Sequence, residues 1–221
     1  MNILAIDTVT DVLSIAAEGP KGLVTQTFAG SNRSHAEQLV PLIETTIALA
    51  GFTAPQIDVV LSSNGPGSFT GLRLGYSAAK ALQLAANSAF IPIPTLACIA
   101  HQYAAWQGGL AVIIDAKRDR FYVQLFKDGK SIAEPSDSSV EEIIPWFSKS
   151  ECWLVTGYGT QAFQAALTAV VLRQQCYFIE NLPVCFAPSM ISYAKQYMDT
   201  LVKASDYDGP LYIRKSDAEK D

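Results

Sequence analysis

One stretch of this chain has the residue types and spacing to bind an anion. It covers residues 64–75 and reads Asn-Gly-Pro-Gly-Ser-Phe-Thr-Gly-Leu-Arg-Leu-Gly. An apolar run precedes it at 57–61, and a run of good helix formers follows it at 76–86. This order predicts a strand, a glycine turn and a helix, with Ser68 or Thr70 as the N-cap residue. Such a turn points backbone N–H groups and the positive end of the helix at any group above it.

A glycine turn between a strand and a helix also has a purely structural explanation, because many parallel sheets need glycine there only for tight turning. The stretch lacks the Gly-Lys-Ser/Thr ending of a P-loop, and its glycine spacing differs from that of a dinucleotide-binding fingerprint. Neither of these two common nucleotide-binding folds is therefore indicated.

The same stretch resembles a more specific signature. Gly-Pro-Gly-Ser-Phe-Thr-Gly-Leu-Arg-Leu-Gly is similar to the motif of the bacterial TsaB (YeaZ) family, which belongs with the TsaD/Gcp-like proteins. The resemblance is strong over residues 1–126 and thinner over 127–205. Four further segments agree with it, at residues 3–8, 33–44, 113–118 and 210–214.

This resemblance implies a role in making N6-threonylcarbamoyladenosine (t6A) at position 37 of tRNAs that read ANN codons. Family members are partners of a TsaD-like transferase, so we expect a non-catalytic scaffold or activator subunit, with a TsaE-like ATPase as a further partner. The tRNA would be reached indirectly, through the complex. Two enzyme functions are the alternatives: an ATP-dependent acyl- or phosphotransferase and, with less support, a metallopeptidase.

The two halves of the chain repeat one pattern of elements. The first half predicts strands at 2–8, 12–17 and 23–29. The second half predicts strands at 110–114 and 121–126 and a Gly-x-Gly turn at 157–159 before a helical run. This repetition predicts a duplicated α/β unit, and the resemblance implies the actin/sugar-kinase/Hsp70-like (RNase H-like) fold. We expect two lobes, at residues 1–106 and 107–221, of which the second is reduced.

In that superfold, an acidic residue at the end of the first strand of each lobe lies near the metal and the phosphates. Asp7 and Asp115 occupy the analogous positions. The alternative, which we favour, is that each aspartate only caps the loop after its strand, because residues 8–12 carry hydroxyls but no glycine. We therefore expect a vestigial site and no intrinsic cofactor, with ATP or ADP bound only in the heteromeric complex. The cofactor-binding candidates are Asp7, Thr8, Gly65, Gly67 and Ser68.

Two predicted helices form the candidate partner surface. The first, at about 34–50, begins with a capping box at Ser34, and Gly51 ends it. The second, at about 70–86, carries small residues at every fourth position and is apolar almost all round, so one face is expected to meet a partner helix. When alone, the chain is expected to form a homodimer through this same surface. The interface candidates are His35, Leu39, Leu42, Ile43, Gly71, Leu74, Gly75, Ala78, Ala79 and Leu82.

The chain lacks the residues that threonylcarbamoyl transfer requires in a TsaD-like protein. TsaD proteins hold a metal with histidines just after the strand that corresponds to residues 91–94. Alignment of that strand places Thr95, Leu96 and Ala100 at the ligand positions, and leucine and alanine cannot bind a metal. His101 is one residue out of register, and the chain has only 2 histidines. We therefore predict no catalytic residue and no metal ligand.

The composition indicates a cytoplasmic protein with partners. Hydrophobic residues make up 49% of the chain and charged residues 17%, which is little charge for the surface of a free monomer. The net charge of −5 disfavours tight binding of bare nucleic acid. The basic loop at 117–120 is expected to be a solvated hairpin tip, with tRNA contact as the alternative. The 4 cysteines indicate buried free thiols, and we expect neither a signal peptide nor a membrane-spanning segment.

Overall fold

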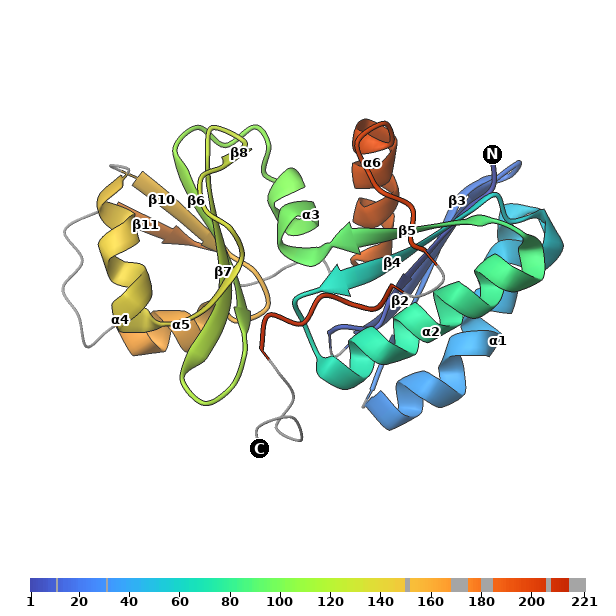
Figure 1. The fold of residues 1–221 in the computed structure, drawn as a ribbon, viewed down its shortest axis with the longest axis horizontal. Coiled ribbons are helices and arrows are strands. Elements are labelled where there is room, and N and C mark those ends of the chain that lie inside the picture. Colours follow the sequence, from blue (N-terminus) through green and yellow to red (C-terminus); the bar gives the residue numbers. More distant parts are fainter. Residues whose placement is uncertain are drawn as a thin grey trace. The chain divides into compact units, whose positions relative to one another are not determined.

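Two separate sheets divide the chain into two units (Figure 1). The first unit comprises Met1–Pro94 and Pro183–Leu211, and the second comprises Thr95–Leu182 and Tyr212–Asp221. This division differs from the predicted boundary after residue 106, because the chain enters the second unit at Thr95 and later returns to the first. The computed structural model describes residues 1–10, 12–30, 32–149, 152–167, 175–179, 185–205 and 208–214.

The first unit holds a five-stranded sheet in the order β3-β2-β1-β4-β5. β1 is antiparallel to β2 and parallel to β4, and β5 continues the parallel side of the sheet. All five residues of β1 are buried, as expected for a central strand that is covered on both faces. The strands are β1 (Ile3–Asp7), β2 (Val12–Gly19), β3 (Gly22–Ala29), β4 (Val59–Gly65) and β5 (Ala89–Pro94).

The second sheet repeats this arrangement in the order β11-β10-β6-β7-β8, and β9 also pairs with β7. β6 is antiparallel to β7 and parallel to β10, just as β1 is antiparallel to β2 and parallel to β4. The predicted duplication is therefore confirmed. The strands are β6 (Gly109–Asp115), β7 (Arg120–Lys127), β8 (Lys130–Ser131), β9 (Ser136–Ser139), β10 (Cys152–Thr156) and β11 (Gln175–Phe178).

Helices cover both faces of the first sheet. α1 (Asn32–Ala50) and α2 (Phe69–Ala86) share one core with alternate residues of β2, such as Leu13 and Ile15. The intervening residue Ser14 instead contacts the N-terminus of α6 (Ala187–Tyr197), which packs on β1 and β2. Because side chains alternate along a strand, α6 lies on the opposite face from α1 and α2 (Figure 1). A short 3-10 turn, η1 (Ala54–Gln56), joins α1 to β4.

The second unit has shorter helices and an aromatic core. Phe147 lies at the centre of this core, with its ring centroid 5.0 Å from that of Trp153 and 6.1 Å from that of Phe163. The C-terminal segment joins this unit through Arg214, which donates to both carboxylate oxygens of Asp137. The helices are α3 (Thr95–His101), α4 (Val140–Ile143), the 3-10 helix η2 (Ile144–Lys149) and α5 (Thr160–Leu167).

The helix ends follow the predicted signals with one exception. Ser68 caps α2, and its Oγ accepts a hydrogen bond of 3.2 Å from the Gly71 N–H. Gly51, with φ of +90°, follows the last residue of α1. The predicted N-cap at Ser34 is wrong, because α1 already begins at Asn32 and places Ser34 inside the first turn.

The small residues of α2 face the interior of the first unit. Gly71, Gly75 and Ala79 are all buried. A Cβ atom at Gly71 would overlap the carbonyl oxygen of Thr8, and one at Gly75 would lie 2.6 Å from Thr8 Oγ1 and 2.9 Å from Ser62 Oγ. The prediction that this small face meets a partner helix is therefore corrected. The small residues instead allow α2 to approach β1 and β4 closely.

This inward packing predicts that Gly75→Leu lowers the free energy of unfolding. A leucine at this position has no room beside Thr8 and Ser62, and overpacking of a core costs roughly 1–3 kcal/mol or more. Urea denaturation followed by circular dichroism measures the change. Ala81→Leu is the matched control, because Ala81 is exposed on the same helix. Equal stability of the two variants would contradict the inward orientation.

Candidate functional site

The glycine turn after β4 lies beside the end of β1. These two strands are parallel neighbours, so their carboxyl ends meet at the same edge of the sheet. The Ser68 N–H donates to the Val9 carbonyl at 3.3 Å, and a Cβ at Gly67 would lie 2.8 Å from Val9 Cβ. Gly65 has φ of +105°, which favours glycine. The five predicted cofactor-binding residues are thus brought together at one edge.

The hydroxyl groups of this edge are hydrogen-bonded within the fold. Thr8 is only 1% exposed, and its Oγ1 donates a 2.6 Å bond to the Gly71 carbonyl. Ser68 Oγ accepts from the Gly71 N–H as the helix cap. The C-terminal segment also closes on the turn, because the Leu211 N–H donates to the Asn64 carbonyl at 2.8 Å. Neither Thr8 nor Ser68 is arranged as an open phosphate ligand.

Asp7 is completely buried at the end of β1. Its Oδ1 accepts a 2.8 Å bond from Ser63 Oγ and a long 3.4 Å bond from the Val9 N–H, whereas its buried Oδ2 has no hydrogen-bond partner. Burial raises the pKa of Asp7 from 3.8 to about 6, although the bonds from Ser63 and Val9 oppose this shift. A group with these properties holds a proton much more readily than an exposed aspartate does.

The N-terminus of α6 covers this carboxyl group. Ser14 Oγ accepts a 3.1 Å bond from the Ala187 N–H and lies 3.0 Å from Cys185 Sγ. Met190 Sδ lies 4.0 Å from Ser63 Oγ. Burial raises the pKa of the Cys185 thiol, and the nearby charge of Asp7 raises it further, although the contact with Ser14 lowers it. No local pattern predicts this cover, because α6 follows β1 by about 180 residues of chain.

Asp115 has the analogous place in the second unit but a different environment. Its Oδ1 accepts a 2.7 Å bond from the Lys117 N–H, and its Oδ2 lies 2.8 Å from Lys117 Nζ. Gly159 allows the turn after β10 to approach, because a Cβ there would overlap the Asp115 backbone. Asp115 thus caps the loop that follows its strand, which is the interpretation favoured from the sequence.

Most of the predicted interface residues are inside the first unit. His35, Leu39 and Ile43 of α1 are buried with the small residues of α2, so their assignment to a partner surface is corrected. His35 is fully buried with its ring edge-on to Phe28, and neither of its ring nitrogens has a hydrogen-bond partner. His35 is therefore a residue of the core and not of the surface. The remaining four candidates are half-buried against the core, namely Leu42, Leu74, Ala78 and Leu82.

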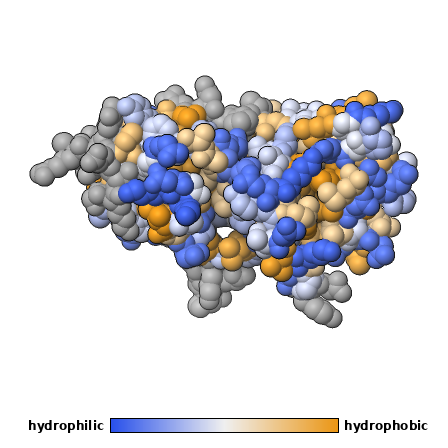
Figure 2. All heavy atoms as spheres, turned by 90° about the horizontal axis from the view of Figure 1, so that it is seen from above, coloured by the Kyte–Doolittle hydropathy of each residue, from blue (hydrophilic) through white to orange (hydrophobic). Residues whose placement is uncertain are grey.

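The exposed face of the two helices carries a different set of residues. Leu84 is 78% exposed on α2 and Val40 is 59% exposed on α1. Ala81 and Ser77 lie one and two turns before Leu84 and are also exposed. Figure 2 shows the side that is uppermost in Figure 1, on which apolar and polar residues are interspersed. We define the outer helix surface as Val40, Ser77, Ala81 and Leu84 together with the half-buried Leu42, Leu74, Ala78 and Leu82.

Comparison with known proteins places the chain in a family. A family model described as TsaD, tRNA N6-adenosine threonylcarbamoyltransferase, matches residues 29–219. The Escherichia coli (strain K12) protein named tRNA threonylcarbamoyladenosine biosynthesis protein TsaB is 29% identical over 233 residues, which cover 100% of this chain and 97% of that protein. The chain belongs to the TsaB (YeaZ) family of TsaD-like proteins.

Solved structures confirm the fold class. A Pseudomonas aeruginosa protein described as similar to peptidase YEAZ has a TM-score of 0.79 at 22% identity, over 96% of this chain and 99% of its own. The Lmo2764 protein of Listeria monocytogenes, proposed to be an N-acetylmannosamine kinase, has a TM-score of 0.52 at 11% identity, over 90% of this chain and 100% of its own. At these identities the likeness establishes the fold alone, the duplicated fold shared with sugar kinases.

In this TsaB-family chain, the positions expected from the sequence to correspond to transferase metal ligands are buried and uncharged. Thr95, Leu96 and Ala100 all lie in α3 with at most 7% exposure. Burial lowers the pKa of His101, which ends the same helix. In the described part of the chain, no three histidine, cysteine, aspartate or glutamate side chains gather where they could hold a metal ion. The prediction of no metal ligand stays a prediction.

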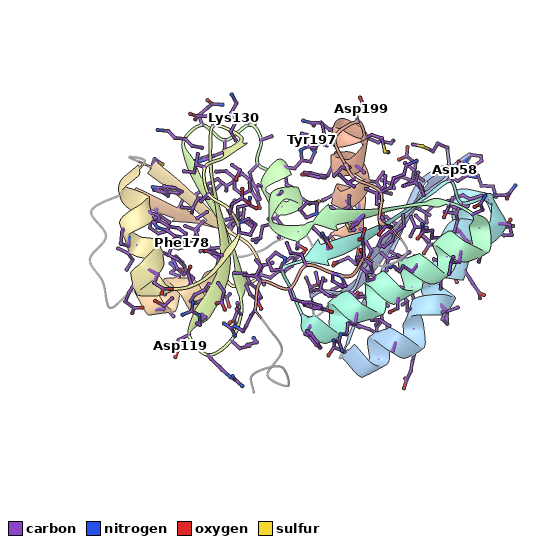
Figure 3. All side chains as sticks on the ribbon, in the orientation of Figure 1. Asp58, Asp119, Lys130, Phe178, Tyr197 and Asp199 are labelled. Carbon is purple, nitrogen blue, oxygen red and sulfur yellow. The ribbon has the colours of Figure 1, made fainter. Side chains whose placement is uncertain are left out.

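Three other predictions concern the basic loop, the cysteines and membrane-spanning segments. Of the basic loop, Arg120 is engaged with Asp137 at 2.9 Å, and Asp119 lies at the tip, at the opposite end of β7 from Lys130 (Figure 3). The four cysteines are free, but only Cys98 is fully buried, so the prediction of buried thiols holds for one of them. None of the described helices combines the length and apolarity needed to cross a membrane.

The environment of Asp7 predicts a specific dependence of stability on pH. Because its pKa is raised on folding, the folded state holds the proton more tightly, and stability is lost as the pH rises from about 4 to about 6. A shift of this size corresponds to roughly 3 kcal/mol above pH 6. Asp7→Asn should remove this loss and be more stable than the parent at pH 7.5, as measured by urea denaturation across this pH range. Asp199→Asn, at an exposed position, should leave the profile unchanged (Figure 3); a parent-like profile for Asp7→Asn would contradict the assignment.

Proposed function

We propose that this chain is a non-catalytic subunit in the biosynthesis of t6A at adenosine 37 of tRNAs that read ANN codons, and that it binds and activates a TsaD-like transferase. The name of the Escherichia coli relative supports the pathway. The relative covers the full length of this chain, so the comparison concerns the whole protein and not one lobe.

The observation that supports the non-catalytic assignment is that the hydroxyl groups at the glycine turn are already hydrogen-bonded within the fold. Thr8 and Ser68 have their hydroxyls bonded to Gly71, and Asp7 is fully buried under α6. A phosphate-binding site requires N–H and hydroxyl groups that face the ligand, and Mg²⁺ requires carboxylate oxygens that it can reach. The turn instead holds α2 against the sheet, so its role is to position that helix.

The outer helix surface supports binding of the transferase. An exposed leucine and valine on adjacent helices expose apolar area to water, and burial of such a side chain contributes about 1.5–3 kcal/mol. The four half-buried residues on these helices extend this area toward the core. A partner helix that packs along α2 would cover Ala81 and Leu84 together, because they lie on neighbouring turns of one face.

The other proposed partners are those that the family resemblance implies. A TsaE-like ATPase would act on the heteromer, and ATP or ADP would be bound in that complex. The net charge of −5 favours indirect contact with tRNA, through the transferase. The isolated chain would form a homodimer, and the cytoplasm is where its tRNA substrates would be modified.

One observation favours an enzyme instead. The Oδ2 atom of Asp7 is buried without a partner, and such a group sometimes marks the place of an absent ligand. If Asp7 and Asp115 bound Mg²⁺ and ATP, the chain would be an ATP-dependent acyl- or phosphotransferase. ATP hydrolysis by the purified chain, lost in Asp7→Asn, would favour this alternative. No described feature favours a metallopeptidase.

The proposed partner surface is tested by lysine substitution. Ala81→Lys and Leu84→Lys should weaken binding of the TsaD-like transferase about 10- to 100-fold, the equivalent of losing burial of one leucine. Isothermal titration calorimetry measures binding, and t6A formed on tRNA by the reconstituted proteins measures function. Val202→Lys is the matched control, because Val202 is 80% exposed in the same unit but lies outside the two helices.

Three outcomes would contradict the proposal. The first is t6A formation by this chain without a transferase. The second is unchanged binding by both helix variants while their stability is intact. The third is equal loss of binding in Val202→Lys, which would show that any added charge disturbs the complex.

A further inference from the structure

The strand β3 is an open edge of the first sheet. It pairs with β2 along all eight of its residues, and no described strand lies beyond it in the sheet. Among the described residues, its backbone makes no hydrogen bond outside that pairing. Alternate N–H and C=O groups of an edge strand point away from the sheet, so β3 presents one row of them to solvent.

The residues of β3 lack the charges, prolines and bulges that usually protect an edge strand against pairing. Natural edge strands carry lysine or other charges, proline, or a bulge that turns the edge away. The residues Gly22-Leu-Val-Thr-Gln-Thr-Phe-Ala29 include no charged residue and no proline, and the pairing with β2 has an unbroken register. The side chains alternate regularly, with Val24, Gln26 and Phe28 half-buried and the residues between them exposed.

We propose that β3 pairs with β3 of a second copy of this chain, antiparallel and with Gln26 on the two-fold axis, so that the two sheets join into one. In this register Val24 lies opposite Phe28 of the second copy, and Thr25 lies opposite Thr27. Both pairs occur twice because of the symmetry. Apolar pairs and threonine pairs are among the favourable cross-strand neighbours.

The register follows from the two faces of the strand. A two-fold axis perpendicular to the sheet leaves each face of the strand on the same side of the joined sheet. An even-numbered residue must therefore lie opposite an even-numbered residue of the second copy, and an odd-numbered residue opposite an odd-numbered one. Val24 and Phe28 both pack against the core beneath α1, and their pairing continues that core across the axis. The neighbouring register, centred on Thr25, would place Phe28 opposite Gly22 and Val24 opposite Gln26. It therefore loses the apolar pair.

A second copy suits this edge better than a charged or irregular strand does. The neutral strand brings no like charges together when it meets itself, and Lys21 lies outside the eight paired residues. Two strands of this length bury less than the roughly 1,200 Å² of a stable interface, so we expect association only at high protein concentration. The contact also leaves Ala81 and Leu84 of α2 free, so a sheet-joined pair could bind two transferases.

This arrangement differs from the homodimer expected from the sequence. That expectation relied on the small face of α2, which packs inward against Thr8 and Ser62. The inference about β3 rests on the backbone edge and not on the proposed function. Self-association through β3 and transferase binding through the outer helix surface are therefore separable by mutation.

A cysteine on the two-fold axis tests the register. Directly opposed residues on antiparallel strands have Cα atoms about 4.5–5.5 Å apart, within the range of a disulfide. Gln26→Cys should form an intermolecular disulfide under mild oxidation, whereas Thr25→Cys should not, since its copies would be about 7–8 Å apart on the diagonal. The loss of the 3.0 Å bond from Thr46 Oγ1 to Gln26 Oε1 is tolerated, because Thr46 also contacts the Leu42 carbonyl. The parent chain, with its 4 cysteines, is the background control.

Charged substitutions on the edge of β3 test the same contact without a disulfide cross-link. Thr25→Lys/Thr27→Lys should be monomeric by sedimentation velocity at concentrations where the parent chain associates, and it should still bind the transferase. Leu84→Lys should still associate through β3 while its transferase binding is weakened.

Two results would overturn the inference: association that survives in Thr25→Lys/Thr27→Lys and is lost in Leu84→Lys, or disulfide formation that is no faster in Gln26→Cys than in Thr25→Cys. A parent chain that stays monomeric at millimolar concentration, with no cross-link in Gln26→Cys, would overturn it as well. Each of these leaves the proposed function standing, because transferase binding is measured separately.

Discussion

The close contact between α2 and the end of β1 is the constraint on which the rest of the first unit depends. Gly71 and Gly75 have no side chains, so the helix backbone can lie directly against Thr8, with the Thr8 hydroxyl bonded to the Gly71 carbonyl. This contact fixes which face of α2 is buried. It therefore also fixes that Ala81 and Leu84 face outward and that Asp7, next to Thr8, lies within the interior.

Much of the fold was predictable because its signals are local. Alternating and continuous apolar runs, hairpin glycines and the cap at Ser68 place the strands and helices of both halves within a few residues. The duplication was predictable as well, because the Asp7 and Asp115 strands are followed by the same hairpin pattern. The start of α1 was mispredicted, since several residues before Ser34 can also begin a helix.

The residues of the candidate site were predictable from the sequence, but their burial was not. The motif brings Asp7, Thr8, Gly65, Gly67 and Ser68 to one edge, as the sequence order implies. Whether the small face of α2 points inward could not be derived from its spacing, because every-fourth-residue periodicity is the same for a core face and a partner face. The cover over Asp7 was also hidden, because α6 reaches it through contacts between residues far apart in the chain, such as Ser14 and Ala187.

The environment of Asp7 differs from that of a carboxylate that binds a metal ion. An ionised carboxylate that binds Mg²⁺ must stay hydrated or coordinated, whereas burial under α6 raises the pKa of Asp7 to about 6 and leaves Oδ2 without a partner. A site under selection for catalysis has reason to keep such a group open to its ligand. In this chain the same position is enclosed by Ser63, Met190 and the N-terminus of α6, and the glycine turn beside it holds α2 against the sheet.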